Sequence, residues 1–248
     1  MISFITSVYE GKKYLDRFLL SMVNVKGIEK SELVLIVNKT KTYEQDLSII
    51  NDYVNKLPLN IVTCEPEPIY SSWNRGIKEA KNNLIANANL DDVIYPNYIE
   101  VMIELVKKYK KTSLFCGWDH LITKEENLYK TSADIKDSHR ATYNRSFLGG
   151  KAGFITLQDS LQRCYLGCHP VWKKELHKKH GYFNNEYGSA GDYEFWTRCI
   201  SQGERAYCTS EIIGAYFFNP IGLSSSEESL GKSALQDKRI KEKYAKDI

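Results

Sequence analysis

The sequence predicts an α/β protein with a mostly parallel central sheet that is flanked by helices on both faces. The first observation behind this prediction is that short apolar runs alternate with segments of helical spacing over the first 108 residues. The second is that 42% of the 248 residues are hydrophobic, which is enough for one large core. We therefore expect a single domain that covers residues 1–248.

The elements of the first half follow from these patterns. Residues 2–8 form a short apolar run with β-branched side chains and predict a strand. The continuous apolar run at residues 32–37 is typical of a buried parallel strand. Further strands are predicted at residues 59–64 and 84–88, and helices at residues 12–22, through Leu47, Ile50, Val54 and Leu57, and at residues 72–80 and 96–108.

The pattern weakens after residue 118. Residues 122–153 mix charges with Gly149 and Gly150 and predict a mobile surface loop. A helix is expected at residues 192–201, an apolar stretch at 211–218 and an exposed charged helix at 227–243. We accordingly divide the domain into a first half at 1–118, a second half at 119–226 and a C-terminal helix at 227–248.

Charge and segment composition exclude several classes of function. Lys and Arg number 34 against 31 Asp and Glu, and a net charge of +3 gives no case for nucleic-acid binding. The N-terminus lacks the features of a secretory signal, and no apolar run approaches the length of a membrane span. We expect a cytoplasmic protein with at most peripheral contact with the inner face of a membrane.

Two adjacent carboxylates, Asp91 and Asp92, follow the strand predicted at residues 84–88. Ligands of open α/β sheets bind at the carboxyl ends of the strands, so this position favours a binding role. Adjacent acids repel each other unless a cation lies between them, and Mg²⁺ or Mn²⁺ takes such oxygen ligands together with phosphates. The alternative is a solvated turn before the helix that starts near Pro96.

A second acid, Asp192, lies in the first turn of the helix predicted at residues 192–201. Helix geometry places Phe195 and Trp196 on neighbouring faces, which suggests an acid beside an aromatic wall for a sugar ring. The alternative is a helix cap, because the helix dipole favours an acid at this position.

Together these segments resemble the inverting family 2 glycosyltransferases of the GT-A fold, especially the bacterial enzymes that build surface polysaccharides. The resemblance covers nearly the whole chain and keeps the order of the family's motifs. The segments that carry it are Ser7-Val8-Tyr9-Glu10, Trp73-Asn74-Arg75-Gly76-Ile77, Asn89-Leu90-Asp91-Asp92, Gly167-Cys168-His169-Pro170-Val171-Trp172-Lys173 and Gly191-Asp192-Tyr193-Glu194-Phe195-Trp196-Thr197-Arg198.

The resemblance implies that a sugar moves from a nucleoside-diphosphate sugar to a hydroxyl of a glycan or a lipid-linked saccharide, with inversion at the anomeric carbon. Asp192 would be the general base, and Asp92 would bind Mn²⁺ or Mg²⁺ with Asp91 in support. The first half would bind the donor and the second half the acceptor. The implied donor residues are Ser7, Tyr9, Glu10, Asn38, Asn74, Arg75, Asn89 and Asp91, and the implied acceptor residues are His169, Trp172 and Trp196.

The chain departs from the family's pattern at several positions. Glu10 replaces an Asn, Asn89 replaces an Asp of the metal motif, and Gly191 replaces the Glu beside the base. The loop at residues 38–42 also lacks the family's usual Asp-Gly-Ser. Two other functions therefore stay open: a catalytically weak carbohydrate-binding or assembly module, and a nucleotidyltransferase that makes the sugar nucleotide. The second fits less well, because residues 7–13 lack a Gly-rich phosphate loop.

Overall fold

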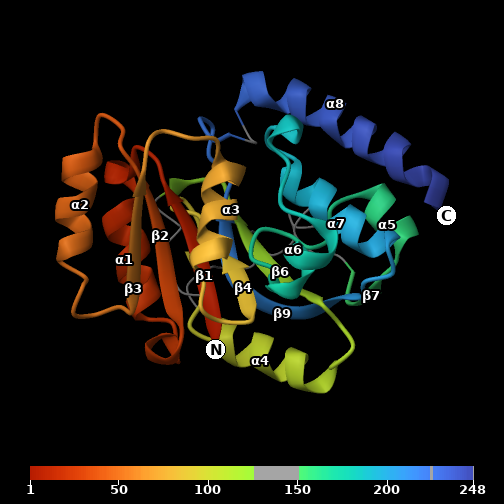
Figure 1. The fold of residues 1–248 in the computed structure, drawn as a ribbon, viewed down its shortest axis with the longest axis horizontal. Coiled ribbons are helices and arrows are strands. Elements are labelled where there is room, and N and C mark those ends of the chain that lie inside the picture. The colour runs from red at the N-terminus through yellow and green to blue at the C-terminus, as the bar shows by residue number, and fades with distance from the viewer. Residues whose placement is uncertain (126–150, 224–225, 248) are drawn as a thin grey trace.

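The computed structural model describes residues 1–125, 151–223 and 226–247, and Figure 1 shows one central sheet with helices packed on it. Nine strands of the described chain form this sheet, in the order β3-β2-β1-β4-β8-β6-β9-β5, with β7 also paired to β9. The strands β1 (Ile2–Val8), β2 (Glu32–Asn38), β3 (Leu59–Cys64) and β4 (Leu84–Asn87) are parallel to one another. Parallel strands need crossover connections, and helices supply them here.

The helices of the first half lie on both faces of these strands. They are α1 (Leu15–Val23), α2 (Tyr43–Asn51), α3 (Ile69–Glu79) and α4 (Tyr98–Lys108), with short 3₁₀ helices η1 (Gly11–Lys13) and η2 (Ile28–Lys30). Helix α3 starts at Ile69, three residues before the predicted start, directly after Pro68. Helix α2 ends at Asn51, so Val54 and Leu57 lie in the turns that follow.

The second half extends the same sheet. Strand β8 (Val171–Lys173) pairs antiparallel with both β4 and β6 (Leu114–Ile122), and β6 pairs in parallel with β9 (Ala206–Phe217). Strands β5 (Val93–Ile94) and β7 (Gly153–Ile155) run antiparallel to β9. Six of the nine described strands thus share one direction, which confirms the mostly parallel sheet, while β5, β7 and β8 run against it.

Helices α5 (Leu157–Gln162), α6 (Glu175–His180), α7 (Gly191–Ser201) and α8 (Glu227–Tyr244) belong to the second half, with 3₁₀ helices η6 (Asn185–Tyr187) and η7 (Ala245–Asp247). Helix α8 was predicted to be an exposed charged helix, and this is wrong on one face. Ile240 and Tyr244 are buried against Tyr187 and Tyr193, because helix α8 packs over helix α7 as Figure 1 shows.

Two apolar cores lie on opposite faces of the sheet, because successive strand residues point to opposite faces. Phe4 and Leu35 face α1 and α4, and pack with Phe18 and Tyr98 in the first core. Ile5, Val34 and Ile36 face the other way, where α3 and α7 supply Trp73, Ile77, Phe195 and Trp196.

The loop predicted at residues 122–153 lies mostly outside the described ranges. Ile122 closes β6 and Gly153 opens β7, so most of the predicted loop at 122–153 falls on residues 126–150, which are not described. The predicted apolar stretch at 211–218 is part of β9, apart from its last residue. In the described ranges, no helix combines the length and the apolarity that a membrane crossing requires.

Candidate active site

The carboxyl ends of β1 and β2 carry the first group of predicted donor residues. Ser7 is half-buried, and Tyr9 is exposed just beyond the strand. Glu10 has a left-handed backbone with φ 48°, and its carboxylate lies 2.9 Å from Lys41 Nζ. The left-handed conformation is uncommon for a residue other than glycine, and it turns the chain sharply into η1.

Asn38 joins the loops at these strand ends. Its side chain is fully buried; Nδ2 donates to Val8 O at 3.2 Å and Oδ1 accepts from Glu67 N at 3.0 Å. The same amide also reaches Ser7 Oγ and Ser72 Oγ at 3.5 and 3.4 Å. Asn38 was predicted to bind the donor, and the structure places it beneath the surface as a support for the loops that would do so.

Arg75 lies on α3 and forms a bidentate pair with Glu67. Arg75 Nε and Nη2 donate to Glu67 Oε1 and Oε2 at 3.0 and 2.9 Å. Hydrogen bonding from Arg75 lowers the pKa of Glu67 in spite of partial burial. Arg75 is still partly exposed, so this pair presents a fixed cation beside the ends of β2 and β3.

Asn74, next to Arg75, was also predicted to contact the donor. Its Nδ2 donates to Phe183 O at 2.9 Å, and its Oδ1 accepts from Phe183 N at 3.0 Å. Both polar groups of the amide therefore hold the loop before η6 against α3. The contact of Asn74 with the donor stays a prediction beside this structural role.

Asp91 and Asp92 lie between β4 and β5 but differ in exposure. Asp92 is 2% exposed; Oδ1 accepts from Phe217 N at 2.9 Å and Oδ2 from Asn89 Nδ2 at 3.0 Å. Asp91 is half-buried, and its Oδ2 accepts from Asn219 Nδ2 at 3.1 Å. Asp91 is therefore the more accessible carboxylate, and Asp92 supports it from below.

His169 lies behind this pair and is fully buried. Its Nδ1 lies 2.7 Å from Asp119 Oδ1, and its Nε2 lies 3.8 Å from Asp92 Oδ2, too far for a hydrogen bond. Burial opposes a charge on His169, but Asp119 and Asp92 raise its pKa above the ordinary value. Burial, and then the charge of Asp91, raise the pKa of Asp92 to about 7, while His169 opposes this rise.

No group of three or more His, Cys, Asp or Glu side chains in the described part of the chain has the arrangement of a metal site. A cation at Asp91 would therefore take most of its ligands from a bound diphosphate and water, as Mg²⁺ commonly does.

Asp192 lies in the first turn of α7, as predicted, and is half-buried. Its Oδ1 accepts two hydrogen bonds, from Tyr193 N at 2.8 Å and from Tyr70 Oη at 3.0 Å. Burial raises the pKa of Asp192, and these hydrogen bonds oppose the rise. A carboxylate with a raised pKa is suited to accept a proton near neutral pH.

The segment before β8 links the two carboxylate sites. Asn87 Nδ2 donates to Cys168 O at 2.8 Å, which fixes this segment against the end of β4. Burial raises the pKa of the Cys168 thiol, and the charges of Asp92, Asp119 and Asp192 add to this effect. The charges of Asp92 and Asp192, which are 100 residues apart in sequence, thus both raise the pKa of the Cys168 thiol.

Trp172 and Trp196 were predicted to contact the acceptor, and the structure corrects this prediction. Their exposed fractions are 0% and 1%, and the two rings pack edge to face with centroids 5.0 Å apart. Apolar burial explains the position of both indoles. Neither ring is accessible to a sugar, so neither indole can form an aromatic platform for the acceptor in this structure.

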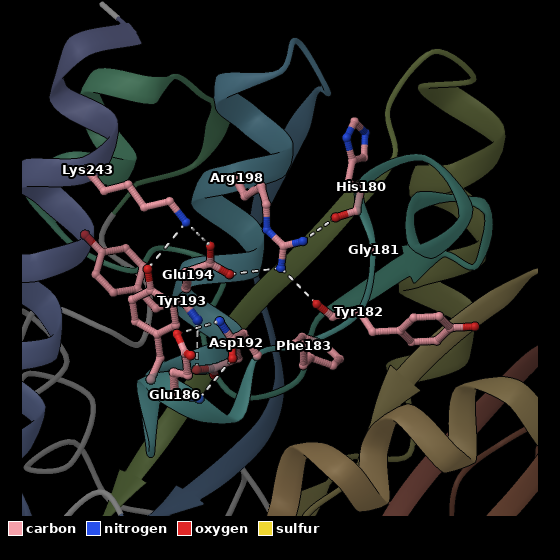
Figure 2. Close-up of polar contacts among 12 residues, drawn as sticks. His180, Gly181, Tyr182, Phe183, Glu186, Asp192, Tyr193, Glu194, Arg198 and Lys243 are labelled. Carbon is pink, nitrogen blue, oxygen red and sulfur yellow. Dashed lines mark hydrogen bonds and ion pairs between the residues drawn. The ribbon is translucent and has the colours of Figure 1, made fainter.

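Glu194 is a residue whose position the sequence did not reveal, although it lies within the last of the quoted motifs. Its side chain is 2% exposed and accepts from Arg198 Nη2, Lys243 Nζ and Tyr244 Oη at 2.9, 2.9 and 2.5 Å. Figure 2 shows Arg198 reaching on to the backbone carbonyls of His180 and Tyr182. An Arg four residues after a Glu on an aromatic helix was the available signal, but the partners on α8 are distant in sequence.

Comparison with solved structures identifies the fold. The S. aureus protein TarS in complex with UDP-GlcNAc matches with a TM-score of 0.72 and 16% identity, over 99% of this chain and 72% of that chain. The mannosyltransferase PcManGT from Pyrobaculum calidifontis, in complex with GDP-Man and Mn²⁺, matches with a TM-score of 0.70 and 14% identity, over 95% and 62% of the two chains. The protein therefore has the GT-A fold, as predicted.

The family follows from the sequence comparison. Residues 3–174 match Glycosyl transferase family 2, and this is more than half of the chain, so the protein belongs to that family. An uncharacterized glycosyltransferase of Rickettsia prowazekii is 27% identical over 79% of this chain and 57% of the relative. One from Rickettsia typhi is 25% identical over 81% and 58%. The chain thus spans less than three-fifths of the length of these relatives.

Proposed function

We propose that the protein is an inverting, metal-assisted glycosyltransferase that uses a nucleoside-diphosphate sugar and a saccharide hydroxyl, on a glycan or a lipid-linked acceptor. The observation that carries this proposal is that Cys168, which is hydrogen-bonded to Asn87 at the end of β4, lies within the electrostatic influence of both Asp92 and Asp192. The structural neighbours were solved with UDP-GlcNAc and with GDP-Man and Mn²⁺, which supports a donor of this class. One continuous sheet joins the proposed donor half, 1–118, to the proposed acceptor half, 119–226, which supports a single domain.

The side chains at Asp91 fit a divalent cation. Asp91 and Asp92 are adjacent, and the charge of Asp91 contributes to the raised pKa of Asp92. A cation bound to Asp91 would offset this repulsion, and its charge would stabilise the departing diphosphate. Asp92 would keep its hydrogen bonds to Phe217 N and Asn89 and hold the loop in place. This exchanges the roles expected from the resemblance, in which Asp92 binds the metal with Asp91 in support, because Asp92 is only 2% exposed.

Asp192 would carry the proton transfer. Its Oδ2 takes the proton of the acceptor hydroxyl, and the acceptor oxygen forms the bond to the anomeric carbon. The bond from that carbon to the diphosphate oxygen breaks, and the nucleoside diphosphate leaves with the electron pair. General-base catalysis of this kind contributes about 10²- to 10⁴-fold to a rate.

The donor site is tested by thermal shift with UDP- and GDP-sugars, each with and without Mn²⁺. A ligand at about a hundred times its Kd should stabilise the wild type by roughly 2.7 kcal/mol. Asp91→Asn should lose the Mn²⁺-dependent shift and keep its stability without ligand. Asp92→Asn should lower that ligand-free stability as well, because the buried site loses an acceptor. An unchanged Mn²⁺-dependent shift in Asp91→Asn would show that the cation does not bind at Asp91.

The reaction is tested by release of nucleoside diphosphate in the presence of saccharide acceptors. Asp192→Asn should reduce release by at least about 10²-fold while the donor still binds. Product anomers observed by NMR should be inverted relative to the donor. Equal release by the wild type and Asp192→Asn for every acceptor would favour the binding or assembly module.

A further inference from the structure

We propose that Tyr70 is a positioning residue for Asp192, which holds one carboxylate oxygen so that the other is presented to the acceptor. This role rests on the proposed function of Asp192 as the base. Tyr70 lies on α3, 122 residues away in sequence, and belongs to none of the motifs that identified the site.

The hydrogen bonds around Asp192 are one-sided. Oδ1 accepts from both Tyr70 Oη and Tyr193 N, at 3.0 and 2.8 Å. Both hydrogen bonds that other residues of the described ranges donate to the Asp192 carboxylate thus end on Oδ1. A carboxylate fixed through one oxygen leaves the lone pairs of the other free to accept a proton.

The Tyr70 ring is held by its surroundings rather than by its hydroxyl. Only 3% of the residue is exposed. The ring stacks on Phe183 with centroids 5.6 Å apart and meets Trp73 edge to face at 5.3 Å. The two hydrogen bonds between Asn74 and the Phe183 backbone fix this aromatic group to α3. The hydroxyl can therefore be removed without loss of the ring packing.

The absence of a side chain at Gly191 leaves room for the Tyr70 ring. A Cβ at residue 191 would lie 2.6 and 2.8 Å from two carbons of the Tyr70 ring, and 2.9 Å from Asn184 O. Real Cβ atoms do not approach so closely, so any larger residue would displace the ring or the helix start. The position from which Tyr70 reaches Asp192 therefore requires glycine at residue 191.

Tyr70 is one of several groups that set the pKa of Asp192, so its contribution to that pKa can be measured. Tyr70 on α3 contacts Asp192 directly, and the other titratable groups that interact with it electrostatically are Asp237 on α8 and the thiols of Cys164 and Cys168 before β8. Burial raises the pKa of Asp192. The hydrogen bonds from Tyr193 N and Tyr70 Oη lower this pKa, and the charge of Asp237 adds a smaller rise. The pKa of Tyr70 itself is well above the ordinary value because of burial, so its hydroxyl remains a donor at neutral pH.

The direct test compares Tyr70→Phe with Tyr193→Phe. The control also removes a buried hydroxyl, but one that donates to Ser160 O rather than to Asp192. The pKa of Asp192 is read from the ¹³C carboxyl resonance, assigned with Asp192→Asn, and needs no substrate. Tyr70→Phe should move the titration midpoint upward by about one pH unit, since a hydrogen bond to the charged form is lost. Tyr193→Phe should leave it in place.

An unchanged midpoint in folded Tyr70→Phe would overturn the positioning role. The pH profile of kcat/KM gives the second readout: its acid limb should move upward by the same amount, with about a tenfold loss of rate below the limb. Failure of the proposed function is distinguishable, because the NMR midpoint would still move while wild type and Asp192→Asn release nucleoside diphosphate equally.

Discussion

At the scale of single residues, Asn89 shows why an amide is present where the family resemblance places an acid. Its Nδ2 donates to Asp92 Oδ2 at 3.0 Å, and Asp92 already lies beside Asp91. A carboxylate at residue 89 would add a third negative charge to this group. The sequence predicted the acids, but it did not predict this hydrogen bond, because the orientation of the amide depends on the folded loop.

Asn89→Asp should lower the free energy of unfolding by about 1–3 kcal/mol at pH 8, because a hydrogen bond becomes a like-charge contact. The loss should shrink at pH 5, where one carboxyl of the pair can hold a proton and donate it. Urea unfolding at the two pH values measures both effects. Asn55→Asp, in an exposed turn, is the matched control and should change stability by less than about 0.5 kcal/mol. An equal loss at both pH values would contradict the electrostatic explanation.

Gly191→Ala should lower stability by about 1–3 kcal/mol, because the added methyl overlaps the Tyr70 ring. Gly231→Ala on α8 is the control: a Cβ there meets nothing within 4 Å. Alanine favours a helix over glycine, so the control should be neutral or more stable by up to about 1 kcal/mol. If both variants gain stability in thermal unfolding, the close approach of residue 191 and Tyr70 is not real.

At the scale of elements, local patterns predicted most strands and helices of the first half and fewer of the second. Strands β1 and β3 match their predicted ranges, because β-branched apolar runs identify them. Strand β8 has only three residues and no periodicity of its own, and it exists because β4 and β6 pair with both of its edges. The packing of α8 on α7 likewise depends on side chains about 50 residues apart, which no local pattern reports.

Glu194→Ala should release α8 from α7. The buried carboxylate accepts from Arg198, Lys243 and Tyr244, and its removal leaves two cations without their partner (Figure 2). Loss of one member of a buried ion pair costs about 3–5 kcal/mol; the Glu194–Arg198 pair is of this kind, whereas Lys243 is 47% exposed and adds little. Urea unfolding measures the loss, and limited proteolysis should show earlier cleavage within α8.

Glu242→Ala is the matched control on the same helix. The Glu242 side chain is 67% exposed and lies 3.8 Å from Lys238, so the pair should contribute less than about 0.5 kcal/mol. Equal losses for the two alanine variants would mean that the Glu194 group does not hold α8.

At the scale of the whole molecule, an aromatic cluster joins the end of the sheet to the helices of the second half. His177 lies within it, stacked on Phe195 with centroids 4.6 Å apart. Trp172 Nε1 donates to His177 Nε2 at 2.8 Å, which assigns the ring proton to Nδ1, 3.1 Å from Gly181 O. The neutral ring is therefore the form that fits. Composition predicted one large core, but not a histidine inside it.

Acid should destabilise the protein through His177. Burial lowers the pKa of His177 from 6.5 to about 4, so its contribution is complete above pH 6.5 and is lost as the pH falls toward 4. Compared with His177→Gln, the wild type should lose up to about 3 kcal/mol of its unfolding free energy between pH 7 and pH 4. Asp92 has a raised pKa and therefore stabilises the protein as the pH falls. It is present in both proteins, so its contribution cancels in the difference between their unfolding free energies. A stability difference that does not vary with pH would exclude this role.

The hydrogen bonds to Asp91 and Asp92 set an order for biosynthesis. Both acids emerge early from the ribosome, yet two of their three donors, Asn219 Nδ2 and Phe217 N, lie 128 and 125 residues later. A nascent chain that ends after β6 has the acids, the first parallel strands and the local hydrogen bond from Asn89 to Asp92, but it lacks these two donors. On the proposed function, nucleotide-sugar binding should therefore begin only when β9, the last strand along the chain, has been synthesised and has paired with β6.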